Sequence, residues 1–518
     1  MQLNSSSILC TGVRLHYQPL FYSLLATRKI PPPTDEMMKI KILHRYDISP
    51  PANSVPTTTL PLTFFDIPWL LFSPMRRLFF YDFPQSPESF TQTTLPLLVR
   101  SLSLCLCRFF PFASSLVLPL APPQKPYILY SDGDSLSLTV AESAADFTDL
   151  FSNEPHDATL IHPLVPQLPP PRASDGARVG PLMAIQVTLF RNKGICIGVQ
   201  FLHVVADGRS FTHFMKSWAS IHRSGGDPTC IESDDLSPFH DRGVIKDLNG
   251  LEPILLKDCW SCVGPSSSLS PSPSPSPSPI LHIVANKVRA MFILQKAHID
   301  RLKAQILSQL KNDGLDSESD PIHLSTFVVT CAFIWVCIVK SRDEEHQCRD
   351  QSSPERGNDE FCHFVFVADC RDRLKYSIPL TYFGNCLVAC YLSEKRNTLL
   401  GKSGILHATR TIGRRVKEIG TGGALRGMEG WIRNFNMIKD GDVVSVAGSP
   451  RHKVYDTDFA WGRLRKSHVV HIDASRSISL TESRDGDGGV EVGLALTTVC
   501  MEKFISLFEK GLKSFMSP

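Results

Sequence analysis

The chain has 518 residues, and its 54 Lys and Arg residues against 51 Asp and Glu residues give a formal net charge of +3. Nucleic-acid-binding domains usually carry a strongly basic face or stripe, so this near-neutral balance argues against nucleic acid as a partner. With 42% hydrophobic and 20% charged residues the composition is that of a globular protein, and the length predicts two or three folding units.

Membrane and disulfide classes are also disfavoured. The longest uncharged apolar run, 324–339, has 16 residues, fewer than the roughly 20 that span a bilayer, so it predicts a buried core helix. The 15 cysteines are scattered, and Cys259 and Cys262 form a single CxxC pair without the second pair that zinc requires. We therefore predict reduced thiols, a cytosolic protein and no metal site.

The N-terminal segment differs from the rest of the chain. Its first 34 residues contain three basic residues but no acidic one, a composition that organelle transit peptides share. Strand-like alternation begins only at 39–42, just after Met37. We expect the functional chain to start near Met37, with residues 1–36 as a disordered leader or a mis-set start; organelle targeting is the alternative.

Two strands and a helix are predicted in the middle of the first half. Residues 182–190 and 195–202 are predicted to form a hairpin whose turn places Gly194 where a positive φ is needed. Ser210 is predicted to cap a helix whose apolar residues recur at helical spacing. Residues 203–208 are therefore expected at a strand-to-helix junction.

Residues 226–280 are predicted to be a crossover connector between an N-terminal domain at 37–225 and a C-terminal domain at 281–518. Ser and Pro alternate from 270 to 279, a pattern that can form neither a helix interior nor a sheet ladder. We interpret this segment as a surface insertion; a phosphorylated docking motif is the alternative.

Beyond the connector we predict an amphipathic helix at 299–310, a buried helix at 324–339, a strand at 361–369 and a closing helix at 501–512. Residues 485–489 lie between two alternating stretches and predict the turn of a hairpin. They do not match a calcium loop, which would need ligands spread over 12 residues ending in Glu.

Among the histidines, His203 has the best setting for chemistry. It ends an apolar strand, precedes a glycine turn and stands four residues before Asp207. A neutral imidazole with a pKa near 6.5 can act as a general base, worth roughly 10² to 10⁴ in rate. By itself the His-x-x-x-Asp pattern is weak, and a histidine with an incidental acid is the alternative. No G-x-S-x-G motif supplies a nucleophilic serine.

A second motif, Asp458-Phe459-Ala460-Trp461-Gly462, follows about 250 residues later. Together the two resemble the His-x-x-x-Asp and Asp-Phe-Gly-Trp-Gly motifs of plant BAHD acyltransferases. The segments 110–113 (FPFA), 368–374 (ADCRDRL) and 382–386 (YFGNC) resemble further elements of that family. The resemblance covers about residues 38 to 516.

The resemblance implies an α/β (α+β) fold of two chloramphenicol-acetyltransferase-like domains with a solvent channel between them. His203 would deprotonate an acceptor hydroxyl, which attacks an acyl-CoA thioester directly. The same resemblance implies acyl-CoA as a co-substrate, no bound cofactor, and a monomer.

Site roles follow from the resemblance as expectations. Asp207 would be a structural acid that pairs with an arginine, for which Arg371 is the first candidate and Arg373 the second. Asp458 would be a loop-fixing or accessory acid paired with Arg463. The supporting residues are Gly208, Phe459, Trp461 and Gly462. Ala460 replaces the family's middle glycine, where a Cβ at a positive φ would cost about 1 kcal/mol.

The substrate class is the last expectation. Residues 63–66, 186–190 and 382–386 resemble a subgroup that acylates flavonoid, anthocyanin and phenolic glucosides. That resemblance implies malonyl-CoA as the first candidate donor, hydroxycinnamoyl-CoA as its competitor, and a sugar hydroxyl as acceptor. A non-catalytic scaffold relative is the alternative, although the intact His203 and Asp207 favour an enzyme.

Overall fold

The apolar stretches of the chain form three β-sheets in a computed structural model. The structure describes residues 40–120, 124–233, 236–262, 279–312, 322–349, 360–438 and 441–516. The predicted leader at 1–36 and the Ser-Pro alternation up to residue 278 lie outside these ranges.

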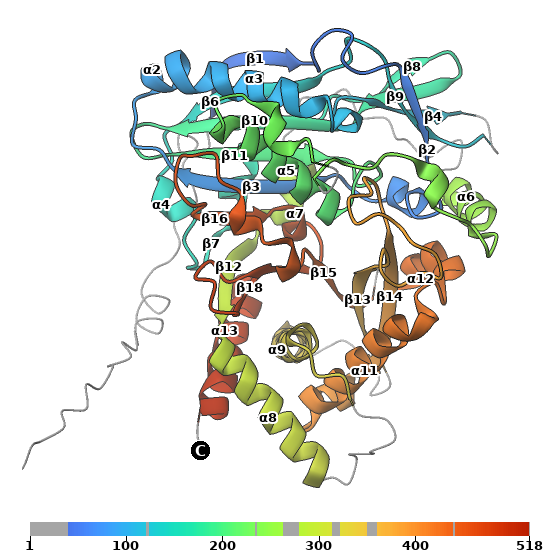
Figure 1. The fold of residues 1–518 in the computed structure, drawn as a ribbon. Coiled ribbons are helices and arrows are strands. Elements are labelled where there is room, and N and C mark those ends of the chain that lie inside the picture. The colour runs from blue at the N-terminus through green and yellow to red at the C-terminus, as the bar shows by residue number, and fades with distance from the viewer. Residues whose placement is uncertain are drawn as a thin grey trace, which may run out of the picture.

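A six-stranded sheet forms the core of the upper half of the molecule in Figure 1. Two helices, α3 (Leu95–Leu106) and α5 (Gly208–Arg223), pack against each other beside it. Phe211 of α5 stacks on Phe201 at the end of β11, with ring centroids 4.6 Å apart. In spatial order, the strands are β1 (Ile40–Ile48), β6 (Leu136–Ser143), β10 (Met183–Phe190), β11 (Gly194–Phe201), β3 (Met75–Asp82) and β16 (Lys466–Val469).

The predicted hairpin is confirmed, because β10 pairs with β11 in antiparallel register from Met183↔Phe201 to Phe190↔Gly194. The reason given for its glycine was wrong. Asn192 adopts the positive φ of 56°. Gly194 instead provides space, since a Cβ there would lie 2.1 Å from the Phe147 ring.

The predicted helix cap at Ser210 was also wrong. Helix α5 begins at Gly208, and its N-cap is Asp207, whose carboxylate accepts a hydrogen bond from Ser210 N at 2.9 Å. The Ser210 hydroxyl donates instead to the carbonyls of Tyr382 and Gly384. The start of α5 is thus fixed by the acid of the His-x-x-x-Asp motif.

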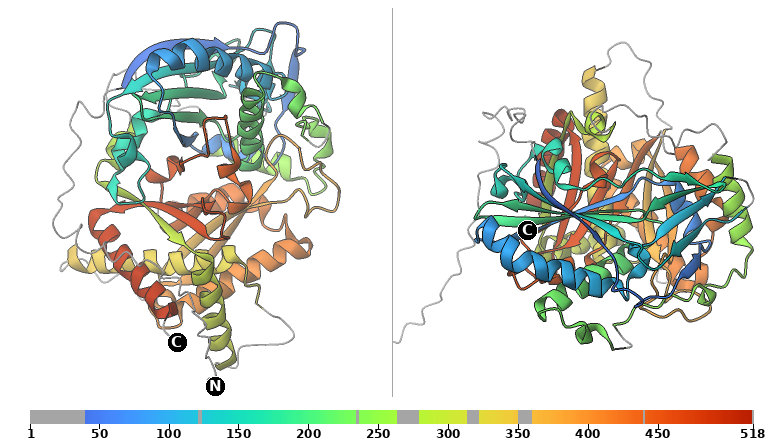
Figure 2. Two further views of the ribbon diagram at one scale, coloured as in Figure 1. Left: turned by 60° about the vertical axis from the view of Figure 1, so that its left-hand side comes forward. Right: turned by 90° about the horizontal axis from the view of Figure 1, so that it is seen from above.

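The lower half contains a seven-stranded sheet, with long helices on one side (Figures 1 and 2). The structure confirms the helices predicted at 299–310 and 324–339, the strand ending at Asp369, the hairpin around 485–489 and the closing helix. The strands, in order, are β14 (Leu387–Lys395), β13 (Phe361–Asp369), β15 (Asp442–Ala447), β17 (Ser477–Glu482), β18 (Val490–Thr497), β12 (Lys287–Leu294) and β7 (His156–Asp157). The long helices are α8 (Lys296–Asn312), α9 (Thr326–Arg349), α11 (Gly404–Glu418) and α13 (Thr498–Met516).

A smaller five-stranded sheet and several short helices complete the described elements. The sheet contains β2 (Thr58–Pro61), β5 (Tyr127–Tyr130), β4 (Ser115–Pro119), β9 (Ala177–Pro181) and β8 (Arg172–Ser174). The shorter helices are α2 (Pro87–Ser89), α4 (Phe147–Leu150), α6 (Leu251–Cys262), α7 (Pro279–Val284), α10 (Arg396–Leu400) and α12 (Trp431–Ile438).

Each half of the chain lends a strand to the other's sheet. β16, late in the sequence, pairs with β3, while β7, early in the sequence, pairs with β12. A buried ion pair of 2.8 Å between Lys466 of β16 and Glu491 of β18 links the borrowed strand to its own half. The division at 226–280 stays a prediction, but these exchanges show that the two halves interlock.

No helix within the described residues is long and apolar enough to cross a bilayer. The apolar part of α9, residues 328–339, is buried, and α9 packs against α11 and α13.

Candidate active site

His203 lies in the short segment that joins β11 to α5 and is partly buried. The ring stacks on Trp69 of the 3₁₀ helix η1 (Ile67–Leu71), with centroids 3.6 Å apart and planes 7° from parallel. Trp431 of α12 meets Trp69 edge-on at 5.4 Å. Burial lowers the pKa of His203 to about 4, so the imidazole is neutral at pH 7 and its unprotonated nitrogen can accept a proton.

Asn385, from the segment just before β14, makes a side-chain contact to this ring, and the backbone of His203 itself also favours the protonated ring. Its Oδ1 lies 3.0 Å from His203 Nδ1. Its Nδ2 donates to the carbonyl of His203 at 2.9 Å and to Asp66 Oδ1 at 3.0 Å. Asn385 and Asp66 are both fully buried, so the hydrogen bonds that link Asp66, Asn385 and His203 are shielded from water.

Asp207 makes no hydrogen bond to His203 and faces the opposite direction. Its Oδ2 lies 2.7 Å from Arg371 Nη1, and it also accepts from the amides of Ser210 and Cys386. Burial acts to raise the pKa of Asp207, but the Arg371 guanidinium and the Ser210 amide together outweigh it, and the net pKa lies below the usual value. Asp207 therefore stays ionised and shapes the turn.

The two predicted arginine partners differ in position. Arg371 is buried and also contacts Asp369 at 3.0 Å and the carbonyls of Tyr382 and Gly384. Arg373 lies near Asp372 instead, at 3.6 Å, and is partly exposed. The structure therefore brings the first candidate, and not the second, to Asp207.

Gly208 is needed for close packing. A Cβ at this position would lie 2.8 Å from His452 Nε2, closer than van der Waals contact allows. Because the His452 ring fills that space, any larger residue would have to displace this ring or the turn that carries His203.

The second motif lies away from the base. Asp458 is half-exposed, pairs with Arg223 at 3.4 Å, and accepts from the amide of Ala460 at 2.8 Å. The expected pair between Asp458 and Arg463 is not formed. The Arg463 guanidinium donates instead to the carbonyl of Arg484. We see no contact of this loop with His203 among the described residues.

Aromatic packing anchors this loop. Phe459 is fully buried and meets Trp218 of α5 edge-on at 5.0 Å, and its carbonyl lies 2.9 Å from His222 Nδ1. Trp461 packs edge-on against Tyr81 at 5.6 Å. The loop is therefore attached to the back of α5, the helix that His203 precedes.

The expected strain at Ala460 is present. Its φ is +65°, in the left-handed region that glycine favours, and Gly462 follows with a φ of +98°. The positive φ explains why glycine suits this position of the motif, and Ala460 adopts the same backbone conformation at a cost in strain.

Three residues at the site were not predicted as site residues: Asn385, Asp66 and Trp69. Asn385 and Asp66 lie within segments already compared with the substrate subgroup, so the motifs pointed to the right places. Nothing in the sequence spacing indicates that an amide would reach a histidine 182 residues away.

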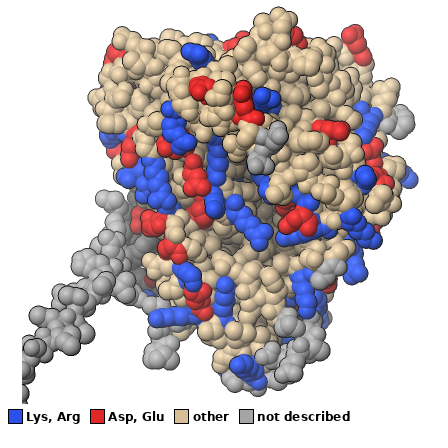
Figure 3. All heavy atoms as spheres, viewed as in Figure 1, with Lys and Arg blue, Asp and Glu red and all other residues tan. Residues whose placement is uncertain are grey.

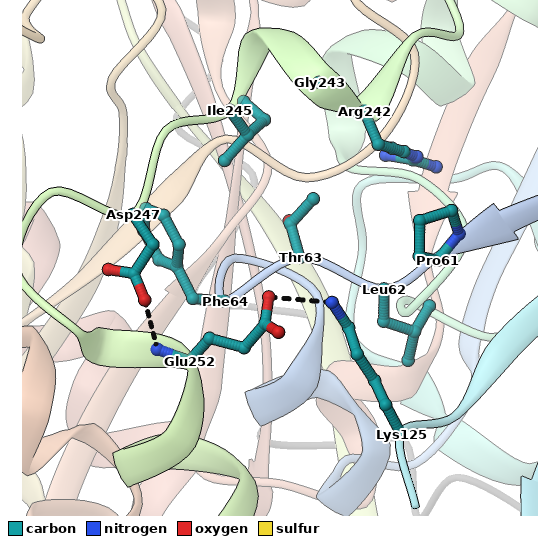
Figure 4. Close-up of a pocket in the computed structure, with 10 residues that line it drawn as sticks. All are labelled: Pro61, Leu62, Thr63, Phe64, Lys125, Arg242, Gly243, Ile245, Asp247 and Glu252. Carbon is teal, nitrogen blue, oxygen red and sulfur yellow. Dashed lines mark hydrogen bonds and ion pairs between the residues drawn. The ribbon is translucent and has the colours of Figure 1, made fainter.

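A separate pocket is lined in part by two neighbours of Asp66 (Figure 4). Its lining includes Thr63, whose amide and hydroxyl both donate to Asp66, and Arg242, which lies 3.8 Å from Asp66. A Lys125–Glu252 ion pair of 2.8 Å crosses one side of it. Its volume of about 210 Å³ is below the roughly 300 to 1,000 Å³ of ligand sites for drug-sized molecules, so we assign it no substrate.

Basic side chains gather around the hollow in the middle of the face that Figure 3 shows, between the two halves. A positive rim of this kind concentrates anionic ligands locally without a large net charge. Within the described part of the chain, no group of three or more His, Cys, Asp or Glu side chains is arranged to hold a metal ion.

Comparisons with known proteins place this geometry in context. The model of the Transferase family matches residues 38–510. The chain is 41% identical over 485 residues to coumaroyl-CoA:anthocyanidin 3-O-glucoside-6''-O-coumaroyltransferase 1 of Arabidopsis thaliana, covering 92% of this chain and 98% of the relative. It is 34% identical over 493 residues to malonyl-coenzyme A:anthocyanin 3-O-glucoside-6''-O-malonyltransferase of Dahlia pinnata, covering 93% and 99%.

Among solved structures, vinorine synthase matches with a TM-score of 0.60 at 18% identity, covering 91% of this chain and 98% of that one. This likeness confirms the fold class predicted from the sequence.

Proposed function

This chain belongs to the BAHD acyltransferases of the Transferase family, and we propose that it moves an acyl group from a coenzyme A thioester to a sugar hydroxyl of an anthocyanin or related phenolic glucoside. The enzyme class, transfer of acyl groups other than aminoacyl groups, follows from the family.

The neutral imidazole of His203, at the strand-to-helix junction, carries the proposed mechanism. Its free nitrogen takes the proton of the acceptor hydroxyl while the oxygen attacks the thioester carbonyl. The carbon–sulfur bond then breaks, and the departing thiolate of coenzyme A takes that proton. The new ester and free coenzyme A account for all atoms, and no covalent enzyme intermediate is needed.

Direct transfer is supported by the lack of a suitable nucleophile beside His203 among the described residues. Cys386, near Asp207, is buried, and burial raises the pKa of its thiol, which keeps it protonated. The Ser210 hydroxyl is held by the carbonyls of Tyr382 and Gly384.

For the donor we propose a hydroxycinnamoyl-CoA, in place of the malonyl-CoA that the sequence favoured. The coumaroyltransferase relative is more similar than the malonyltransferase relative, at 41% against 34% identity. An aromatic wall of Trp69, Phe72, Trp431 and Phe435 beside His203 also suits planar aromatic groups.

Malonyl-CoA is the second candidate, favoured by Arg77 of β3. Arg77 is only 7% exposed, its Nε is buried without a hydrogen-bond partner, and Glu482 is the acid whose charge acts on it, although no ion pair joins the two within the described ranges. Its guanidinium carbon lies 6.0 Å from the ring centre of Phe211, in the first turn of α5. Burial lowers the pKa of Arg77 to about 10, and a carboxylate ligand would stabilise its charge.

A variant at Arg77 separates the two donors. If Arg77 binds a malonyl carboxylate, Arg77→Gln raises the KM for malonyl-CoA by about tenfold and leaves the KM for coumaroyl-CoA unchanged. An equal rise in KM for both donors would show that Arg77 does not distinguish the malonyl from the coumaroyl group.

A donor panel tests the proposal as a whole. Malonyl-, acetyl-, coumaroyl- and caffeoyl-CoA are each incubated with an anthocyanidin 3-glucoside, and products are measured by mass. We expect the highest kcat/KM with coumaroyl- or caffeoyl-CoA, and a loss of roughly 10² to 10⁴ in His203→Ala. His44→Ala, at an exposed position on β1, is the matched control and keeps full activity. No turnover with any donor, with His203→Ala binding ligands like wild type, would favour a non-catalytic scaffold.

We also propose a cytosolic monomer without a resident cofactor that binds acyl-CoA at the basic rim of Figure 3. Free thiols, most of them buried, support a reducing compartment.

A further inference from the structure

The amide of Asn385 has one orientation that its surroundings allow. Its Nδ2 faces three acceptors: Asp66 Oδ1 at 3.0 Å and the carbonyls of His203 and Val204 at 2.9 and 3.3 Å. Turning the amide over would place Oδ1 against those three oxygens and leave buried acceptors unsatisfied, at about 1 to 3 kcal/mol each. The oxygen of Asn385 must therefore face His203 Nδ1, 3.0 Å away.

Asp66 is held as firmly as the amide that it fixes. Its Oδ1 accepts from both the backbone amide and the side chain of Asn385, at 3.2 and 3.0 Å. Its Oδ2 accepts from the amide and the hydroxyl of Thr63, both at 2.8 Å, and Arg242 lies 3.8 Å away. With four donors on two oxygens, the carboxylate has no free rotation left.

We propose that Asn385, held by Asp66, is a positioning residue that selects the Nδ1–H tautomer of His203 and so makes Nε2 the base. An oxygen that can only accept requires Nδ1 to donate, which leaves the lone pair on Nε2. Trp69 fixes the ring plane by stacking, and Asn385 fixes which edge of the ring points into the protein. The role as base rests on the proposed function, whereas the tautomer does not.

The neutral amide distinguishes this arrangement from one in which a carboxylate contacts the histidine. Asn385 orients the ring without adding a full negative charge that would hold the proton on the imidazolium. When Nε2 takes the hydroxyl proton, Nδ1 still donates to the same oxygen, so the ring need not turn before it passes the proton to the thiolate.

The charges that act on His203 come from several elements. Asp66 precedes η1, Asp207 caps α5, and both favour the protonated ring. His471 of η11 (His471–Asp473) is a second titratable ring whose charge interacts with it. A carboxyl group at position 385 would lie about 3.0 Å from Asp66, so the two groups would share a proton and add no second full charge.

The tautomer is measured without substrate. Long-range ¹⁵N NMR of the histidine rings, with His203 assigned from the signals missing in His203→Ala, is expected to show Nδ1 protonated and Nε2 unprotonated in the full chain. In Asn385→Leu we expect a mixture of tautomers. A wild-type His203 protonated at Nε2 would overturn the proposal even if the enzyme is active.

Kinetics test the consequence. Asn385→Leu should lower kcat by roughly 10- to 100-fold with KM for donor and acceptor nearly unchanged, a part of what a placed base contributes. Asp66→Asn keeps an acceptor toward Thr63 and should lower kcat less than Asn385→Leu does. It replaces Asn385→Leu as the test variant if that variant does not fold.

His44→Ala, the exposed control on β1, should keep the wild-type kcat. An unchanged kcat in Asn385→Leu would contradict the positioning role. Absence of turnover in the wild type would remove the proposed function but leave the NMR result to decide the tautomer.

Discussion

At the scale of single residues, the two members of the His-x-x-x-Asp motif point in opposite directions and have separate partners. His203 contacts Asn385, while Asp207 contacts Arg371 at 2.7 Å. The acid of the motif therefore acts through the backbone, as N-cap of α5 and as an anchor of the turn. The acid that reaches the base through an amide is Asp66, more than 130 residues earlier in the chain.

The Asp207–Arg371 pair gives a sharp stability prediction. Arg371→Ala leaves a buried carboxylate without its cation and should lower the free energy of unfolding by about 3 to 5 kcal/mol, measured by urea denaturation. Arg373→Ala, which breaks only a partly exposed contact, is the control and should change it by less than about 0.5 kcal/mol. Equal, small effects would show that Asp207 does not need its partner.

Ala460 gives a prediction of the opposite sign. Ala460→Gly removes a Cβ from a φ of +65° and should raise the free energy of unfolding by about 0.5 to 1 kcal/mol. Ala304→Gly, on the exposed face of α8, should lower it by a similar amount because glycine weakens a helix interior. Thermal unfolding of both variants checks the two signs, and a destabilised Ala460→Gly would mean that the alanine methyl has a packing role.

At the scale of elements, the second motif is an aromatic anchor for α5. Asp458 is 39% exposed and its ion pair with Arg223 is solvent-accessible, so that pair contributes at most about 1 kcal/mol. Phe459, in contrast, is fully buried against Trp218 and Tyr81. The motif thus connects a loop of the second half to the helix that follows the base.

Phe459→Ala tests this anchor. The cavity should cost about 3 to 5 kcal/mol of unfolding free energy, whereas Asp458→Asn should cost less than about 1 kcal/mol. Phe361→Ala, at a position 51% exposed, is the size-matched control and should be nearly neutral. If Asp458→Asn proves as damaging as Phe459→Ala, the acid has a role that its contacts do not show.

Sequence patterns predicted the regular elements well because their signals are local. The β10–β11 hairpin and the helices α8, α9 and α13 follow from hydrophobic spacing alone. For the site, the sequence predicted only the residues that lie in the recognisable motifs. The contact between Asn385 and His203, the cap at Asp207 and the partner of Asp458 depend on how distant segments meet, and no periodicity records that.

At the scale of the whole molecule, several histidines are kept neutral by burial. It lowers the pKa of His203, His240 and His452 to about 4 and that of His471 to about 3. In the unfolded chain these rings titrate near 6.5. Between about pH 6.5 and 4 the unfolded state therefore binds protons that the folded state does not, and stability falls as the pH falls.

We expect the free energy of unfolding to drop steadily from pH 7 to pH 5, by up to about 1.4 kcal/mol per pH unit for each such histidine. Carboxylates with lowered pKa, such as Asp207, lose their contribution only below about pH 4 and do not account for this window. Urea denaturation at several pH values measures the slope, and His452→Gln should reduce it by one proton. A flat profile between pH 7 and 5 would contradict the buried neutral rings.

The borrowed strand β16 has a consequence for how the chain folds as it leaves the ribosome. β3 pairs with residues 466–469, so one edge of the first sheet stays open until nearly all of the chain has been translated. An open edge strand is a template for pairing with other chains, and contacts this distant in sequence form slowly. The nascent first half therefore exposes this edge of β3 during most of translation, and shortening the chain before residue 466 removes the strand that covers it.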